Sequence, residues 1–213
     1  MNLIVVDDHP LFREGVVQLL AGSGDYAEIR EAGNADEALA LFEFARIVFA
    51  IVDISLKGKN GIELIKVLNS KYPEILMLVI SMHDEMYYAQ RALKAGARGY
   101  IMKQEASKNV LTAINRIISG KIYLSEEMRE RMLQTYISAD GSGDSFGIEN
   151  LSDREFQVFQ RIGEGLGVSE IASAMKISVK TVETYRECIK RKLLFKDAHE
   201  LRMSAIKWFQ KKD

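Results

Sequence analysis

Acidic side chains end two apolar segments early in the chain, and a serine and a lysine end two later ones. Asp7 and Asp8 stand at the end of the first segment, Asp53 at the end of the third, and Ser81 and Lys103 at the ends of the fourth and fifth. Neighbouring carboxylates repel one another unless a cation lies among them, and hard oxygen ligands favour Mg²⁺. A lysine and a hydroxyl opposite them suit an anion that also touches the metal. These are the parts needed to transfer a phosphoryl group to a carboxylate.

These side chains can meet only if the segments that carry them form one sheet. Five short, largely apolar segments recur at intervals that leave room for one helix and two loops: 3–7, 27–31, 48–53, 75–81 and 99–103. Apolar strands that alternate with amphipathic helices indicate a parallel sheet covered on both faces. Such a doubly wound α/β sheet binds ligands at the carboxyl ends of its strands, where the polar residues stand. The alternative is that acids gather there only because loops are solvated.

Several helix boundaries are marked by their residue types. Pro10 suits a first helical position, and Asn34 suits the cap of the next helix. Gly96 stands where a further helix should stop. After the last strand, helices are expected over 109–118 and 125–137.

The second half of the chain changes character. Residues 138–147 are almost wholly Gly, Ser and Asp, a composition that forms no core and predicts a flexible linker. Beyond it the apolar residues recur with a helical period, and four compact helices are expected. The sequence therefore predicts an α/β domain over 1–121, a helix and linker over 122–147, and a small all-α domain over 148–213.

Charge is divided unevenly among these parts. Residues 148–213 carry 13 basic and 10 acidic side chains, whereas the whole chain has a net charge of −1. A basic tail is typical of a part that meets a polyanion, although a solvated basic helix face is the alternative. One cysteine and three histidines argue against a disulfide framework and a multi-cysteine zinc site. Apolar runs too short for a bilayer, and a first segment without a basic start, predict a cytoplasmic protein without a membrane span.

Four motifs in the first half resemble the receiver domain of two-component response regulators: DDHPLFREG (7–15), VDISLKGKNGIEL (52–64), VISMH (79–83) and KAGARGYIMK (94–103). The resemblance covers about residues 1–120 and implies a flavodoxin-like fold. By this resemblance, Asp53 is the phosphoacceptor and takes its phosphoryl group from a sensor histidine kinase.

The same resemblance implies roles for the residues around Asp53. Asp8, Asp53 and the backbone carbonyl of Ser55 would ligate Mg²⁺, and Asp7 would act mainly through water. Lys103 and Ser81 would contact the phosphoryl oxygens. Tyr100 would be the aromatic switch that turns inward behind Ser81.

The segment LSDREFQVFQRIGEGLGVSEIASAMKISVKTVETYRECIKRKL (151–193) resembles the LuxR-type helix-turn-helix of NarL/FixJ-class response regulators. Its helix from Ser178 is expected to enter the major groove of promoter DNA. Ten of its residues are expected to lie at the DNA: Lys180, Thr181, Glu183, Thr184, Tyr185, Arg186, Glu187, Lys190, Arg191 and Lys192. Tyr185 stands where some relatives have histidine.

The ten residues divide by the contact that each side chain suits. The first turn, with Lys180 and Thr181, offers free amides to a phosphate. Glu183 and Thr184 suit base edges, whereas Arg186, Lys190, Arg191 and Lys192 suit phosphates. Glu183 and Glu187 repel phosphates, so they are either specificity devices or partners of Arg186 and Arg191 at i,i+4 spacing.

Together these features predict a transcription factor controlled by phosphorylation, rather than a turnover enzyme. It is expected to form a homodimer on phosphorylation or on binding two DNA half-sites. The apolar stripe of the last helix (Leu201, Ala205, Trp208) is either the pairing surface or core. One alternative is an Mg²⁺-dependent phosphatase with an aspartate nucleophile. Such an enzyme would need a second catalytic acid two residues after the nucleophile, where this chain has Ser55. A second rival is a DNA-binding or adaptor protein that works independently of phosphorylation, with a vestigial receiver.

Overall fold

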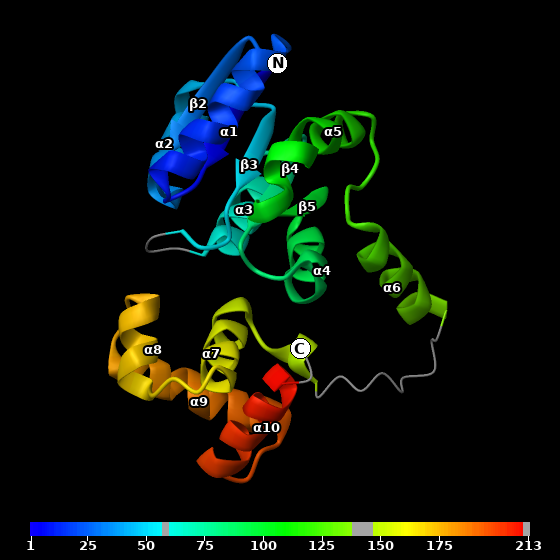
Figure 1. The fold of residues 1–213 in the computed structure, drawn as a ribbon. Helices are drawn as coiled ribbons and strands as arrows, with labels where there is room; N and C mark the ends of the chain where they lie inside the picture. Colours follow the sequence, from blue (N-terminus) through cyan, green and yellow to red (C-terminus); the bar gives the residue numbers. More distant parts are fainter. Residues whose placement is uncertain (57–59, 138–146, 211–213) are drawn as a thin grey trace. The chain divides into compact units, whose positions relative to one another are not determined.

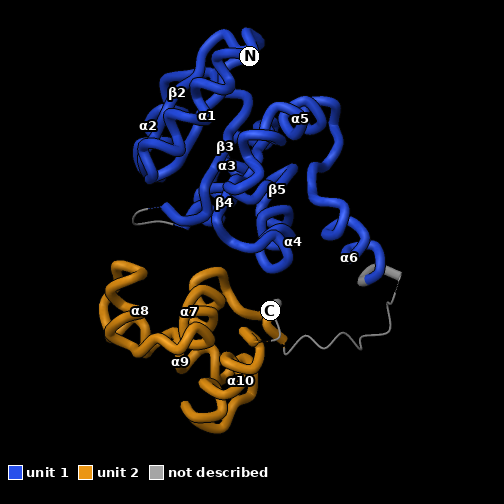
Figure 2. The backbone as a smooth tube through the Cα atoms, viewed as in Figure 1, with its two compact units in different colours: residues 1–139 blue, residues 140–213 orange. Residues whose placement is uncertain are grey.

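The computed structural model describes residues 1–56, 60–137 and 147–210 (Figure 1). The chain divides into two compact units, within 1–139 and 140–213 (Figure 2), and each is described by itself. The predicted linker over 138–147 lies outside the described residues except for Gly147. The domain boundaries at 121 and 147 therefore stay predictions.

The first unit is built on a five-stranded sheet in which every neighbouring pair is parallel. The strand order is β2-β1-β3-β4-β5. The strands are β1 (Asn2–Val6), β2 (Glu28–Ala32), β3 (Phe49–Val52), β4 (Leu76–Ser81) and β5 (Gly99–Met102). The predicted α/β doubly wound sheet is confirmed. The order reverses at β1, which places the ends of β1 and β3 side by side at the point where such sheets bind ligands.

Helices of this unit begin and end largely where the sequence predicts. They are α1 (Pro10–Ser23), α2 (Ala35–Phe44), α3 (Gly61–Lys71), α4 (Glu85–Ala95), α5 (Ala106–Ile118) and α6 (Glu126–Ile137). Pro10 opens α1, and the Asn34 side chain accepts the Glu37 amide at the start of α2. Gly96 ends α4 with a φ of 121°, a conformation that favours glycine. The start predicted for α5 is wrong by three residues, because a 3₁₀ turn over Lys103–Glu105 leads directly into the helix.

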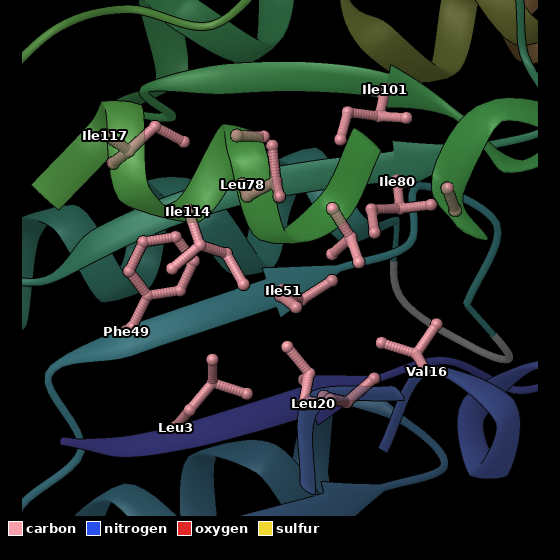
Figure 3. Close-up of a cluster of buried hydrophobic side chains, with 14 residues drawn as sticks. Leu3, Val16, Leu20, Phe49, Ile51, Leu78, Ile80, Ile101, Ile114 and Ile117 are labelled. Atoms are coloured by element: carbon pink, nitrogen blue, oxygen red, sulfur yellow. The ribbon is translucent and has the colours of Figure 1, made fainter. Parts of the chain in front are cut away.

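The main core lies between the sheet and the helices α1 and α5 (Figure 3). Leu3, Phe49 and Leu78 point toward these helices and meet Leu20 and Ile114, all of them fully buried. Since side chains alternate along a strand, the intervening apolar residues face the opposite side of the sheet. There α2, α3 and α4 pack side by side. Both faces are therefore covered, and polar residues collect at the strand ends.

The second unit consists of helices joined by short turns. After a 3₁₀ turn over Ile148–Asn150, its helices are α7 (Asp153–Gly163), α8 (Val168–Met175), α9 (Val179–Leu193) and α10 (Ala198–Gln210). Ser152 and Glu155 form the capping box that starts α7. The predicted all-α domain is confirmed. None of the described helices is long and apolar enough to cross a membrane.

The apolar stripe of α10 belongs to the core of this unit. Leu201 and Ala205 have no exposed surface. The Trp208 ring packs edge-on against Phe156 and Phe159, with ring centroids 5.7 and 5.6 Å apart. Leu201 and Ala205 are therefore core, as the alternative interpretation expected, whereas Trp208 is half-buried and its role in pairing stays a prediction.

Candidate functional site

The polar site lies at the carboxyl edge of the sheet. Because Val6 pairs with Val52, the residues that follow them, Asp7 and Asp53, lie next to each other. Both carboxylates are buried, and the Lys103 ammonium reaches them from the end of β5. Its Nζ lies 2.7 Å from Asp7 Oδ2 and 2.8 Å from Asp53 Oδ2.

Burial and the neighbouring charged groups both shift the pKa values in this cluster. Burial raises the pKa of Asp7. The hydrogen bond from Lys103 opposes this rise, whereas the negative charge of Asp53 increases it. Burial alone would lower the pKa of Lys103, but the hydrogen bond and charge of Asp53, and then those of Asp7, outweigh it and raise this pKa. Lys103 is thus a cation at neutral pH, held between two acids.

The cluster has the composition of a site for a hard divalent cation. Asp7, Asp8, His9 and Asp53 each offer a ligand atom, and these atoms all lie within 4.8 Å of one another. Asp8 Oδ1 is buried, and its neighbour at 2.9 Å is His9 Nδ1. Three carboxylates against one lysine leave an excess of negative charge that a divalent cation would balance. The residues present therefore fit Mg²⁺.

His9 is a member of the cluster that the sequence argument missed. Its Nδ1 lies 2.9 Å from Asp8 Oδ1 and 3.2 Å from Asp7 Oδ1. The same atom is 3.4 Å from Lys103 Nζ. The only signal in the sequence was its position directly after the two aspartates.

Ser81 and Tyr100 lie together behind the acidic cluster. The Ser81 Oγ accepts the His83 amide at 3.2 Å, and the Tyr100 hydroxyl donates to the His83 carbonyl at 2.7 Å. Tyr100 is buried, which raises its pKa well above the ordinary value, although a hydrogen bond with Ser81 opposes the shift. The ring already lies inside the fold. Its role as a switch stays a prediction.

Ser55, two residues after Asp53, connects the end of β3 to the loop after β4. Its amide donates to Asp53 Oδ1 at 3.2 Å, and its Oγ lies 2.9 Å from His83 Nε2. The His83 ring is stacked on Tyr88, with centroids 4.5 Å apart. This bridge joins residues 28 positions apart, so no local pattern of the sequence pointed to it.

Gly61, the first residue of α3, lies directly against the backbone of Asp53 and Ile54. The Gly61 amide donates to the Ile54 carbonyl at 2.9 Å. A Cβ on Gly61 would lie 1.9 Å from the Asp53 carbonyl oxygen. Only glycine therefore allows α3 to begin this close to the backbone of Asp53.

In the second unit, α9 carries all ten predicted DNA residues. The Ser178 side chain accepts the Thr181 amide at 3.0 Å, so this first-turn donor already has a partner. Thr184 Oγ1 donates to the Lys180 carbonyl. Lys180, Glu183, Thr184, Glu187 and Arg191 are exposed, whereas Tyr185, Arg186 and Lys190 are half-buried.

Acids and bases of α9 pair with each other one turn apart. Arg186 Nη1 lies 2.9 Å from Glu183 Oε1, and Lys190 Nζ lies 2.8 Å from Glu187 Oε1. The in-helix alternative expected i,i+4 pairing with Arg186 and Arg191. Arg186 does pair with Glu183, but at i,i+3, and Glu187 pairs with Lys190 instead of Arg191. Both acids thus neutralise a base that the sequence argument assigned to phosphates.

Lys192 is held by α7 rather than directed only to solvent. Its Nζ lies 2.7 Å from Glu155 Oε2, and the Ser152 amide donates to the same oxygen. Burial alone would raise the pKa of Glu155, but the hydrogen bonds from Lys192 and Ser152 outweigh it and lower this pKa. The pair ties the last turn of α9 to the start of α7.

Replacing Lys192 should therefore weaken the fold of the second unit. Lys192→Met leaves the nearly buried Glu155 without its cation, and we expect a loss of about 1.5–3 kcal/mol of unfolding free energy in urea. Lys190→Met is the matched control, since its partner Glu187 is largely exposed, and should cost about 0.5 kcal/mol. Equal losses would contradict this assignment.

The same pair predicts a pH dependence. The folded pKa of Glu155 lies below its ordinary value of 4.5, so its stabilisation is complete above that pH. It is lost as the pH falls through the lowered folded pKa. The wild-type chain should accordingly lose more stability on acidification than Lys192→Met does.

Two family models match the chain. The model "Response regulator receiver domain" matches residues 3–115, and the model "Bacterial regulatory proteins, luxR family" matches residues 149–205. The transcriptional activator protein ExaE of Pseudomonas putida is 32% identical over 206 residues, which cover 97% of this chain and 96% of ExaE. The response regulator UvrY of Escherichia coli is 28% identical, with 97% of this chain and 94% of UvrY covered.

Solved structures agree with these matches. RcsB of Salmonella enterica serovar Typhimurium, bound to the promoter rprA in the presence of the phosphomimetic BeF₃⁻, is 25% identical. Its TM-score is 0.61, and the match covers 96% of this chain and 98% of that chain.

Proposed function

Since this chain belongs to the response regulators that join a receiver domain to a LuxR-type DNA-binding domain, we propose that Asp53 is its phosphoacceptor and controls DNA binding by residues 148–213. The observation that carries the proposal is the placement of Lys103. Its ammonium bridges Asp7 and Asp53 at the carboxyl edge of the sheet, with the Ser81 hydroxyl buried nearby. A phosphoryl group on Asp53 would thus have a cation and a hydroxyl as neighbours.

In the proposed reaction, this chain supplies a carboxylate nucleophile, a cation and a hydroxyl. An Asp53 carboxylate oxygen attacks the phosphorus atom of a phosphohistidine, the new O–P bond forms, and the N–P bond to the kinase imidazole breaks. Lys103 exchanges its contact with the Asp53 carboxylate for one with the phosphoryl oxygens. Ser81 then donates its hydroxyl hydrogen to the phosphoryl group. The protein is modified once and turns over no substrate, so we regard it as a switch.

Asp8, Asp53 and the Ser55 backbone carbonyl would hold Mg²⁺, and Asp7 would act on it mainly through water. When bound, the ion neutralises charge on the phosphoryl oxygens.

The proposed partner of α9 is double-stranded promoter DNA, with the kinase and the DNA meeting the protein in the cytoplasm. RcsB, a relative of known structure, is bound to a promoter in its solved complex. A homodimer on two half-sites is the proposed binding form, because each α9 reads only one half-site. Arg186 and Lys190 must exchange their in-helix acids for phosphates on binding.

Incubation with acetyl phosphate and Mg²⁺, followed by intact-mass measurement, tests the proposal. A stable gain of one phosphoryl group supports the switch. Continuous release of phosphate would point to a phosphatase, and an unchanged mass would point to a vestigial receiver; either outcome would overturn the proposal.

DNA contacts can be divided by their salt dependence. Lys190→Ala should weaken binding to all sequences about equally and lower the slope of log K against log salt concentration by about 1, because one phosphate contact is lost. Thr184→Ala should instead relax the preference at one position of the site. Fluorescence anisotropy over a salt series measures both. A change in sequence preference with an unchanged slope for Lys190→Ala would contradict this division.

A further inference from the structure

After α5 the chain returns along the free edge of the sheet (Figure 1). Residues 121–125, the edge segment, lie beside β5. The Tyr123 carbonyl accepts the Tyr100 amide at 2.9 Å, and the Tyr123 amide donates to the Arg98 carbonyl at 3.0 Å. Gly99 and Tyr123 form a parallel bridge. The edge segment thereby continues the sheet beyond β5, directly beside the residue proposed as the switch.

A second attachment joins the edge segment to α4. Glu85, the first residue of α4, is buried, and its Oε1 accepts the Ser125 amide at 2.9 Å. Burial raises the pKa of Glu85, and hydrogen bonds from Ser125 oppose the shift. Ser125 Oγ in turn accepts the Met128 amide at 3.1 Å and so caps α6. The helix α6 therefore begins at a residue that α4 holds.

Both attachments lie on elements that surround Ser81 and Tyr100. Tyr100 bonds the edge segment through its amide and His83 through its hydroxyl. His83 lies two residues before Glu85, and its amide donates to Ser81. A change at Ser81 must therefore act on the loop that ends at Glu85.

We propose that the edge segment senses the state of the receiver: it is docked while the loop between β4 and α4 has the position seen here, and it loosens when that loop follows Ser81 toward a phosphoryl group. Loosening frees the start of α6, the last described helix before residues 138–146. This inference rests on the proposed role of Asp53, which supplies the phosphoryl group. Because coupling is reciprocal, a segment that is harder to dock must favour the phosphorylated state.

Two substitutions at one position separate the hydrogen bond from the charge. Glu85→Gln keeps an oxygen that can accept the Ser125 amide, whereas Glu85→Ala removes the acceptor. Glu85→Gln is therefore the matched control for the lost charge at the start of α4.

The full chain is studied with Mg²⁺, with and without beryllofluoride. In the wild type and in Glu85→Gln, beryllofluoride should accelerate amide exchange over 121–128 by about fivefold or more, the effect of one hydrogen bond. In Glu85→Ala this segment should exchange rapidly in both states. Glu85→Ala should also bind beryllofluoride about threefold to tenfold more tightly, measured by fluorine-19 NMR titration.

Two results would overturn the inference: unchanged exchange over 121–128 while beryllofluoride is bound, or identical behaviour of Glu85→Ala and Glu85→Gln. Failure of the proposed function looks different. In that case the wild type would show no fluorine signal of bound beryllofluoride, and the assignment of Asp53 would fall together with the inference.

Discussion

Asp53→Asn is expected to take up no phosphoryl group from acetyl phosphate in the presence of Mg²⁺. The amide keeps the shape of the side chain but removes the nucleophilic oxygen and one negative charge of the proposed metal site. Lys103 keeps its 2.7 Å contact with Asp7, so the variant should fold with the circular dichroism spectrum of the wild type. Intact-mass measurement reads the result directly.

Asp25→Asn is the matched control for this substitution. Asp25 is an exposed carboxylate in the loop before β2, and its replacement should leave phosphoryl uptake unchanged. Normal uptake by Asp53→Asn would show that another residue is the acceptor.

Gly61→Ala should damage both stability and phosphorylation. The added Cβ would lie 1.9 Å from the Asp53 carbonyl oxygen and 2.8 Å from Ile54 Cα, so the backbone that carries the acceptor must move. Overpacking of this kind costs about 1–3 kcal/mol, measured by urea unfolding. Because the displaced atoms belong to Asp53 itself, the rate of phosphorylation should fall by about tenfold or more.

Gly15→Ala controls for the effect of adding a methyl group to a helical glycine. Nothing lies within 4 Å of a Cβ at Gly15, which is exposed on α1. Alanine should stabilise that helix by about 0.5–1 kcal/mol and leave phosphorylation unchanged. Equal behaviour of the two variants would refute the steric argument at Gly61.

The architecture followed from the sequence because its signals are local. Continuous apolar segments such as 48–53 gave strands, and Ser152 with Glu155 gave a helix start. Asp7 and Asp53 were expected to meet because parallel strands end at one edge of a sheet, and the structure places both at Lys103.

Contacts between residues far apart along the chain could not be predicted from the sequence. The hydrogen bond between Lys192 and Glu155 joins residues that are 37 positions apart and lie on two helices. In the sequence, a lysine beside other basic residues does not indicate such a contact. The stripe of Leu201, Ala205 and Trp208 was ambiguous for a different reason. Buried cores and pairing surfaces both need apolar residues at helical spacing, so only the packing of α7 decides between them.

The edge-on packing of Trp208 gives the protein a built-in optical reporter. It is the only tryptophan of the chain, and it lies in the second compact unit, in contact with Phe156 and Phe159. Tryptophan emission therefore follows the unfolding of the DNA-binding unit, while far-ultraviolet circular dichroism follows the helices of both. Denaturation curves from the two signals coincide only if both units unfold in one cooperative step. Their separation would measure how independently the receiver and the DNA-binding unit fold.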